Sequence, residues 1–151
     1  MKKLALLAAL GSLAMMLGAW GFEYIGDLAP CKLCLWQRWP HKIAILLGII
    51  MYFMPNRWIA ALGGIVVLAG AGIAFYHAGV ELKLWTGPDT CTGLANAGPL
   101  TVEALWARPV VRCDDIAWSL FGISMAGWNG IISIGLGATW LLAFFKGSQR
   151  A

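Results

Sequence analysis

The sequence is short of charge. Only 12% of its 151 residues are Asp, Glu, Lys or Arg, and 60% are hydrophobic, which gives a mean hydropathy of +0.76. A water-soluble domain with this composition would lack the polar surface that keeps it dispersed. The sequence also lacks an internal repeat, a low-complexity linker and a polar stretch long enough for a second domain. These absences exclude a soluble enzyme and a repeat protein, and they favour a single membrane domain over residues 1–151.

Long stretches without charge predict an all-α bundle of four transmembrane helices. A helix needs roughly 20 residues to cross about 30 Å of hydrocarbon. The expected spans lie at approximately 4–24, 39–56, 58–80 and 118–145. The second is short of charge-free residues, so it needs Trp39, Pro40 and snorkelling basic flanks to complete the crossing. The first also has the form of a cleaved signal peptide, but its apolar run is longer than usual, so we expect a retained span.

Acidic residues are missing from one predicted side of this bundle. That side has five bases and no acid, and the other side has six bases and all seven acids; the five are Lys2, Lys3, Arg57, Lys146 and Arg150. The positive-inside rule therefore places both termini in the cytoplasm. The loops at approximately 25–38 and 81–117 then lie outside. This bias accounts for the pI of about 9.0, so no nucleic-acid partner is needed to explain it.

The second outer loop is the longer one, and it is where a partner could dock, particularly around 94–109. Its segment "PLTVEALWARPVV" places apolar residues among polar ones. Two interpretations of this segment stay open: a short amphipathic helix on the bilayer surface, or an irregular loop packed on the helix ends.

All four cysteines fall in the outer loops, where disulfides can form and persist. An even number on one side favours pairing. A zinc site usually repeats a short knuckle, but only Cys31 and Cys34 have that spacing, which argues against metal. As a structural staple their bridge would close a loop of two residues and constrain little chain entropy. A redox pair is the favoured interpretation.

A redox cysteine needs a stabilised thiolate, and Arg38 can supply the positive charge. It follows Cys34 by four residues, so on a helix the two would share a face. A helix that ran through Pro40 would lose a hydrogen bond there. If instead the helix began near Trp39, Cys34 and Arg38 would meet through a loop. The sequence leaves both arrangements open.

Three segments together resemble the bacterial disulfide bond formation protein B (DsbB) family. They are "CKLCLWQR", "YHAGVELKLWTGPDTC", which leads to Cys91, and "CDDIAWSLFGISMAGWNG", which runs from Cys113 into the last span. The resemblance covers nearly the whole chain. It implies a protein-disulfide:quinone oxidoreductase of the bacterial inner membrane, with its cysteines facing the periplasm.

The resemblance also implies roles for individual residues. Cys91 and Cys113 would form an outer disulfide that a reduced, DsbA-like thioredoxin-fold donor attacks at Cys91. The released thiol would exchange with the Cys31–Cys34 pair, and Cys34 would face a membrane quinone supported by Arg38. Ubiquinone is the expected quinone, and menaquinone is the alternative.

Two alternatives to this function are a vitamin-K-epoxide-reductase-like enzyme and a disulfide-stapled scaffold without activity. The former places its Cys-x-x-Cys late in the chain. Among other residues, His77 is predicted either to contact the quinone or to hydrogen-bond a neighbouring loop. His41 is expected to mark a polar helix end, with the quinone role of His77 as the alternative, and Gln37 is expected to make a packing or headgroup contact.

Overall fold

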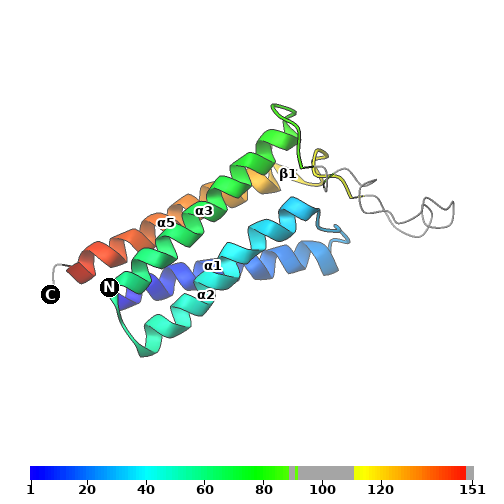
Figure 1. Cartoon of the computed structure of the whole chain (residues 1–151). Helices are drawn as coiled ribbons and strands as arrows, with labels where there is room; N and C mark the ends of the chain where they lie inside the picture. The colour runs from blue at the N-terminus through cyan, green and yellow to red at the C-terminus, as the bar shows by residue number, and fades with distance from the viewer. Residues whose placement is uncertain (89–90, 92–110, 149–151) are drawn as a thin grey trace.

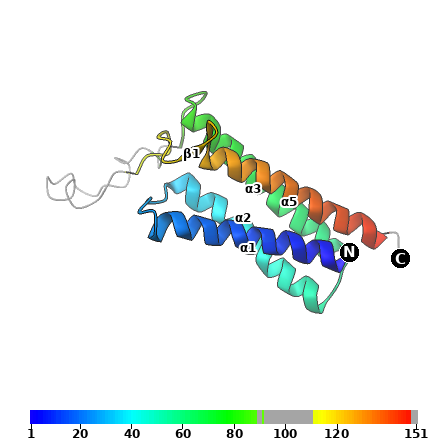
Figure 2. The ribbon, with the colours of Figure 1, turned by 180° about the vertical axis from the view of Figure 1, so that it is seen from behind.

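The computed structural model describes residues 1–88, 91 and 111–148. Four long helices run along a common direction: α1 (Lys2–Tyr24), α2 (Lys32–Phe53), α3 (Arg57–Glu81) and α5 (Met125–Ser148) (Figure 1). The N-terminus, the C-terminal end of α5 and the α2–α3 turn lie at one end of this bundle, in the views from either side (Figures 1 and 2). The prediction of a mostly helical chain built on four long helices is confirmed for the described residues. The predicted interfacial helix and the docking segment at 94–109 lie outside them.

Three of the helices, α1, α3 and α5, are long and apolar enough to cross a membrane. Helix α2 has 22 residues, but its first half carries Lys32, Arg38 and Lys42. Basic side chains of this kind can snorkel to the headgroups. A crossing by α2 therefore stays a prediction.

Helix α2 begins at Lys32, ahead of the predicted span, and continues through Pro40. Cys31 is its N-cap residue, and the Cys31 Sγ accepts a hydrogen bond from the backbone N–H of Cys34 at 3.2 Å. Pro40 packs against Gly70 of α3, where a Cβ atom would come within 2.8 Å of the proline ring. The missing side chain at Gly70 therefore makes room for the proline inside the bundle.

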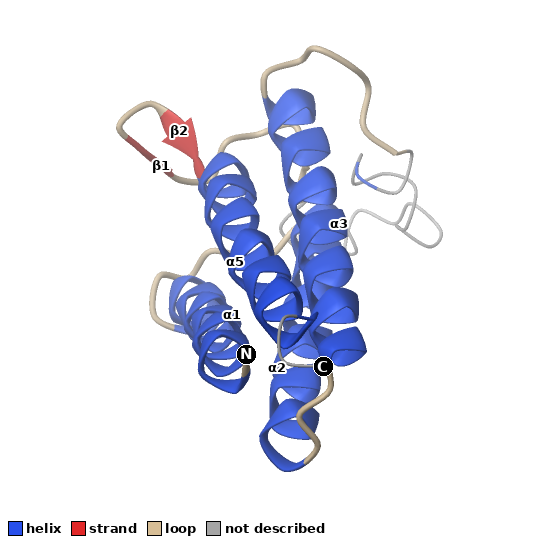
Figure 3. Cartoon of the chain, turned by 90° about the vertical axis from the view of Figure 1, so that its left-hand side faces the viewer, coloured by secondary structure: helices blue, strands red, loops and turns tan. Residues whose placement is uncertain are grey.

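Helix α5 begins at Met125, later than the predicted span of 118–145. The preceding residues form a small antiparallel hairpin of β1 (Ser119–Leu120) and β2 (Ile123–Ser124), at the end of the bundle away from the termini (Figure 3). The two turn residues, Phe121 and Gly122, have φ values of 53° and 76°. A two-residue turn with both φ values positive matches the right-handed twist of a hairpin, so this turn excludes a continuous helix here.

The apolar core at the end near the termini is centred on Trp140 of α5, which is fully buried. Small residues let the helices approach this ring. The ring lies against Gly63 of α3, where a Cβ atom would come within 2.6 Å of it. Close approach through small residues is how helices pack in lipid, where no hydrophobic driving force acts between them.

We expect Gly63→Val to destabilise the bundle by about 1–3 kcal/mol, because the added side chain would overlap the Trp140 ring and force a shift between α3 and α5. The matched control is Gly72→Val on the same helix, since no atom lies within 4 Å of a Cβ there. Thermal unfolding of the purified protein in detergent would measure both variants. Equal losses in the two variants would contradict the packing argument.

Candidate active site

All four cysteines lie together: Cys31, Cys91 and Cys113 are buried in one cluster with Leu33 and Val80, and the partly buried Cys34 packs against it. Cys91 and Cys113 form a disulfide with a Cα–Cα distance of 5.2 Å, which is the pairing that the family resemblance implies. Cys31 and Cys34 are thiols. The two cysteine pairs, separated in sequence, therefore adjoin one another.

The Cys31 and Cys113 sulfurs form the contact between the two pairs. These two Sγ atoms and a ring nitrogen of His77 all lie within 4.8 Å of one another. Thiol–disulfide exchange requires a thiolate sulfur to reach a disulfide sulfur directly. The arrangement therefore suits transfer of a disulfide between Cys113 and Cys31.

Cys31 and Cys34, called the inner pair from here on, lie at the N-terminus of α2. Unpaired backbone N–H groups at a helix N-terminus favour negative charge. The Cys31 thiol donates a hydrogen bond to the Cys34 Sγ at 2.8 Å. That hydrogen bond, together with burial, raises the pKa of the Cys31 thiol well above its ordinary value. The geometry keeps the proton on Cys31 and leaves Cys34 as the sulfur that can carry charge.

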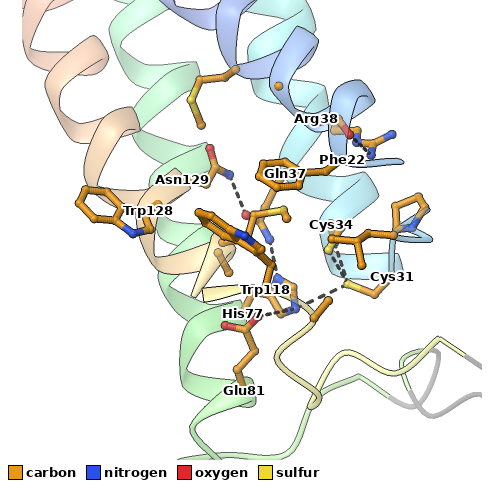
Figure 4. Close-up of a pocket in the computed structure, with 18 of the residues that line it drawn as sticks. Phe22, Cys31, Cys34, Gln37, Arg38, His77, Glu81, Trp118, Trp128 and Asn129 are labelled. Carbon is orange, nitrogen blue, oxygen red and sulfur yellow. Dashed lines mark hydrogen bonds and ion pairs between the residues drawn. The ribbon is translucent and has the colours of Figure 1, made fainter. Parts of the chain in front are cut away.

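A cavity of about 450 Å³ opens beside Cys34. Its walls come from α1, α2, α5 and the hairpin, and they are mostly apolar and aromatic, with Phe22, Trp118 and Trp128 among the lining side chains (Figure 4). A few polar groups from α2 and α3 reach it, including Arg38 and His77. An apolar pocket with a few convergent polar groups is the usual form of a small-molecule site.

Arg38 lies on the same helix as Cys34, one turn later, which resolves the question that Pro40 raised. Its side chain, however, is held by α1: Nη1 donates to the Glu23 carboxylate at 2.5 Å, and Nη2 donates to the Ala19 carbonyl at 3.4 Å. Sequence reasoning missed Glu23. The only indication in the sequence was an acidic residue near the end of an apolar segment, where a nearby base is expected to pair with it.

We expect Arg38→Met to loosen the junction of α1 and α2 at the cavity, because it leaves the Glu23 carboxylate, 21% exposed, without its partner. In a double-mutant cycle with Glu23→Gln, the coupling free energy of unfolding should be about 0.5–3 kcal/mol. Denaturant unfolding in detergent would measure it, with Lys42→Met on the same helix as the control. Strictly additive effects would contradict a working ion pair.

His77, near the end of α3, is 3% exposed and meets groups from α2 and from the segment that precedes the hairpin. Its Nε2 lies 3.2 Å from the Cys113 carbonyl oxygen and 3.6 Å from the Cys31 Sγ. Its Nδ1 lies 2.7 Å from Nε2 of Gln37. Of its two predicted roles, the hydrogen bond to a neighbouring loop is present, and the side chain also lines the cavity.

One further amide, that of Asn129, continues this contact from Gln37 into the bundle (Figure 4), and a second histidine, His41, follows it. Asn129 of α5 donates from Nδ2 to the Gln37 Oε1 at 2.7 Å, and the His41 Nε2 lies 2.9 Å from the Asn129 Oδ1. Sequence reasoning placed His41 at a polar helix end, but it is 4% exposed and buried in the bundle. Sequence reasoning gave Gln37 and Asn129 no role in the site, although a polar amide in an otherwise apolar span is a recognisable indication of a functional role.

Comparisons with known proteins agree on one family. The family model described as "Disulfide bond formation protein DsbB" matches residues 1–143. A disulfide bond formation protein B from Mannheimia succiniciproducens is 31% identical, over 82% of this chain and 74% of that protein. Proteins of the same name from Shewanella frigidimarina and Dechloromonas aromatica are 29% and 27% identical, over 98% and 91% of this chain and 90% and 88% of theirs. No solved structure matches.

Proposed function

The chain belongs to the disulfide bond formation protein DsbB family, and from this premise we propose that it reoxidises a thioredoxin-fold disulfide donor and delivers the electrons to a membrane quinone. The observation that carries the proposal is the contact of the two cysteine pairs beside an apolar cavity. The Cys31 and Cys113 sulfurs lie within 4.8 Å, and Cys34 lines the cavity. A buried staple would need neither feature.

The exchange begins at the outer disulfide. A thiolate of the reduced donor attacks the Cys91 sulfur, the Cys91–Cys113 bond breaks, and the electron pair stays on Cys113 as a thiolate. Cys113 faces the inner pair, so Cys91 is the sulfur left for the donor. Both cysteines are buried, with residue exposures of 4% for Cys91 and 1% for Cys113, so attack requires the groups around Cys91 to move aside.

The disulfide then moves inward. The Cys113 thiolate attacks Cys31 of an oxidised inner pair, a Cys31–Cys113 bond forms, and Cys34 leaves as the thiolate. The second thiol of the donor attacks its own sulfur in the donor–Cys91 disulfide, so the oxidised donor leaves and Cys91 becomes a thiolate. The Cys91 thiolate then attacks Cys113, the outer disulfide recloses, and Cys31 leaves with the electron pair, so the inner pair holds two electrons. The arrangement of the structure, an outer disulfide with an inner dithiol, corresponds to this last state.

The cavity fits a quinone headgroup in size and chemistry. Its volume of about 450 Å³ and its aromatic walls suit a flat, apolar ring, and Cys34, Arg38 and His77 supply the polar contacts. A bound quinone would supply a two-electron acceptor for the inner dithiol. We propose ubiquinone, with menaquinone as the alternative that the same cavity admits.

The direction of transfer follows from redox potentials. A donor of the DsbA type, near about −120 mV, is already a strong oxidant, so only a still more oxidising acceptor can recharge it. Quinones in the bilayer meet that need. We therefore propose that the chain lies in a bacterial inner membrane with its cysteines facing the periplasm, which the charge asymmetry of the sequence supports.

The alternatives are less well supported. A vitamin-K-epoxide-reductase-like enzyme would carry its Cys-x-x-Cys late in the chain, whereas here it lies at the start of α2, the second helix. Cys31, His77 and Cys113 could in principle bind a metal ion, but the Cys113 sulfur is occupied in a disulfide, and a metal ligand must be a free thiolate.

Turnover by the purified protein tests the proposal. The protein in detergent is mixed with an excess of a reduced thioredoxin-fold donor and with ubiquinone, and both donor oxidation and quinone absorbance are followed. We expect many equivalents of donor to be oxidised per chain, with matching quinone loss. Oxidation that stops at one equivalent would identify a static disulfide and refute the function.

A further inference from the structure

The hydrogen bonds between the buried polar side chains run in one direction, from His41 to the sulfur of Cys31. They pass from His41 of α2 to Asn129 of α5, back to Gln37 of α2, and on to His77 of α3. The groups along the path are 3–8% exposed. Each internal contact is 2.9 Å or shorter. A buried polar chain of this kind is costly unless every member is satisfied.

The donor and acceptor of each hydrogen bond follow from the Cys113 carbonyl oxygen, which can only accept a hydrogen bond. The His77 Nε2 at 3.2 Å from it must therefore carry the proton. In the neutral ring Nδ1 is then an acceptor, so Gln37 must present its NH₂ group to it, and its Oε1 faces away. That oxygen accepts from the Asn129 NH₂ group.

The far end of the chain is His41. Because Asn129 donates from its nitrogen, its Oδ1 is an acceptor, and His41 must donate from Nε2 at 2.9 Å. Ser133 also approaches that oxygen, but at 3.4 Å. The His41 Nδ1 is buried without a hydrogen-bond partner among the described residues. Among the described residues, His41 thus makes its polar contacts through Nε2.

We propose that His41 is a positioning residue: acting through Asn129 and Gln37, it adds to the Cys113 carbonyl in holding the His77 tautomer whose Nε2–H lies between that carbonyl and the Cys31 sulfur. Without the donor at His41, both amides can turn over. The Gln37 oxygen would then accept from His77 Nδ1, leaving Nε2 unprotonated against the Cys113 carbonyl. The carboxyl of Glu81, 3.9 Å from Nε2, also favours a proton on that nitrogen.

The chemical consequence rests on the proposed function. When the Cys91 thiolate attacks Cys113 in a Cys31–Cys113 disulfide, the Cys91–Cys113 bond forms, the Cys31–Cys113 bond breaks, and its electron pair goes to Cys31. The Cys31 thiolate then takes up a proton. An N–H placed 3.6 Å from this sulfur stabilises the leaving thiolate and so favours its release.

The tautomer of His77 can be read by NMR with ¹⁵N-labelled histidine, since the sequence has two histidines and a His41 variant assigns both. In the wild type we expect His77 to carry its proton on Nε2. His41→Phe should move the proton to Nδ1 in a large share of molecules, and His41→Gln, which keeps a donor nitrogen, should restore it. Ser133→Ala is the matched control and should leave the wild-type pattern.

An unchanged His77 pattern in His41→Phe would overturn the proposal. If that variant fails to fold, the isosteric Asn129→Asp variant provides the test. A carboxylate at this position can only accept from Gln37, so the Gln37 oxygen would face His77 and the His77 proton should move to Nδ1. A proton that stays on Nε2 would refute the proposed hydrogen-bond path. Retention of the Cys91–Cys113 disulfide, read by alkylation, checks folding.

The rate of outer-disulfide reclosure gives a second measurement. Loss of a hydrogen bond to a charged sulfur should slow it about 10- to 100-fold in His41→Phe, with recovery in His41→Gln. A wild type that does not turn over with donor and ubiquinone would refute the proposed function, while the NMR result would still decide the positioning role. Turnover with an unmoved tautomer would refute the positioning role alone.

Discussion

Cys34→Ser is expected to lower quinone reduction by on the order of 10³-fold or more, which corresponds to about 4 kcal/mol of transition-state stabilisation. The reason is that Cys34 is the cysteine that combines cavity lining with a hydrogen bond from the Cys31 thiol. A serine hydroxyl at this position is neither a comparable nucleophile nor able to form the inner disulfide. Quinone absorbance under excess reduced donor measures the effect.

The same variant contains its own folding control, because the Cys91–Cys113 disulfide does not depend on Cys34. We expect Cys34→Ser to oxidise about one equivalent of donor in a single exchange and then stop. Leu35→Ala, at the neighbouring and 41% exposed position, should turn over at the wild-type rate. A Cys34→Ser protein with full quinone activity would show that another cysteine delivers the electrons, even though the family assignment would stand.

The Cys34→Ser/Cys91→Ser double variant is expected to contain an almost complete Cys31–Cys113 disulfide under oxidising conditions. It leaves these two cysteines as the remaining thiols, and their sulfurs lie within 4.8 Å, so bond formation needs only a small movement. Non-reducing digestion followed by mass spectrometry identifies the linked peptides.

The comparison variant is Cys31→Ser/Cys91→Ser, which leaves Cys34 and Cys113. Cys34 is not a member of the 4.8 Å group, and it lies one helical turn further along, at the cavity, so we expect a much lower yield of linkage. Equal yields in the two variants would mean that the outer pair reaches both inner sulfurs, and that the order of exchange proposed for Cys31 and Cys34 is wrong.

The kind of protein and its chemistry were predictable from the sequence because both depend on local properties. The low charge and the long apolar stretches exclude a soluble fold whatever the packing. The two-residue spacing of Cys31 and Cys34 distinguishes a working redox pair from a staple by loop length alone. The three cysteine-containing segments were enough to identify the family, and the prediction of four long helices is confirmed for the described residues.

The partners of the site residues were not predictable in the same way. Arg38 lines the same cavity as Cys34, near which it was expected, but its ion pair with Glu23 of α1 was not predicted. Gln37 and Asn129, separated by 92 positions, meet inside the bundle. Such contacts depend on how each helix is rotated about its axis and offset along it, and the periodicity of an almost uniformly apolar helix does not specify either.

Backbone geometry also depended on the assembled bundle. Proline in a helix interior is disfavoured locally, yet α2 continues through Pro40, and Gly70 of α3 leaves room for its ring in the bundle. The hairpin before α5 replaces a helix because Phe121 and Gly122 both take positive φ. Composition and cysteine spacing thus determined that this is a membrane protein with redox cysteines. Helix packing decided that Cys113 meets Cys31 and that His77 stands between them, because those contacts join segments far apart in the chain.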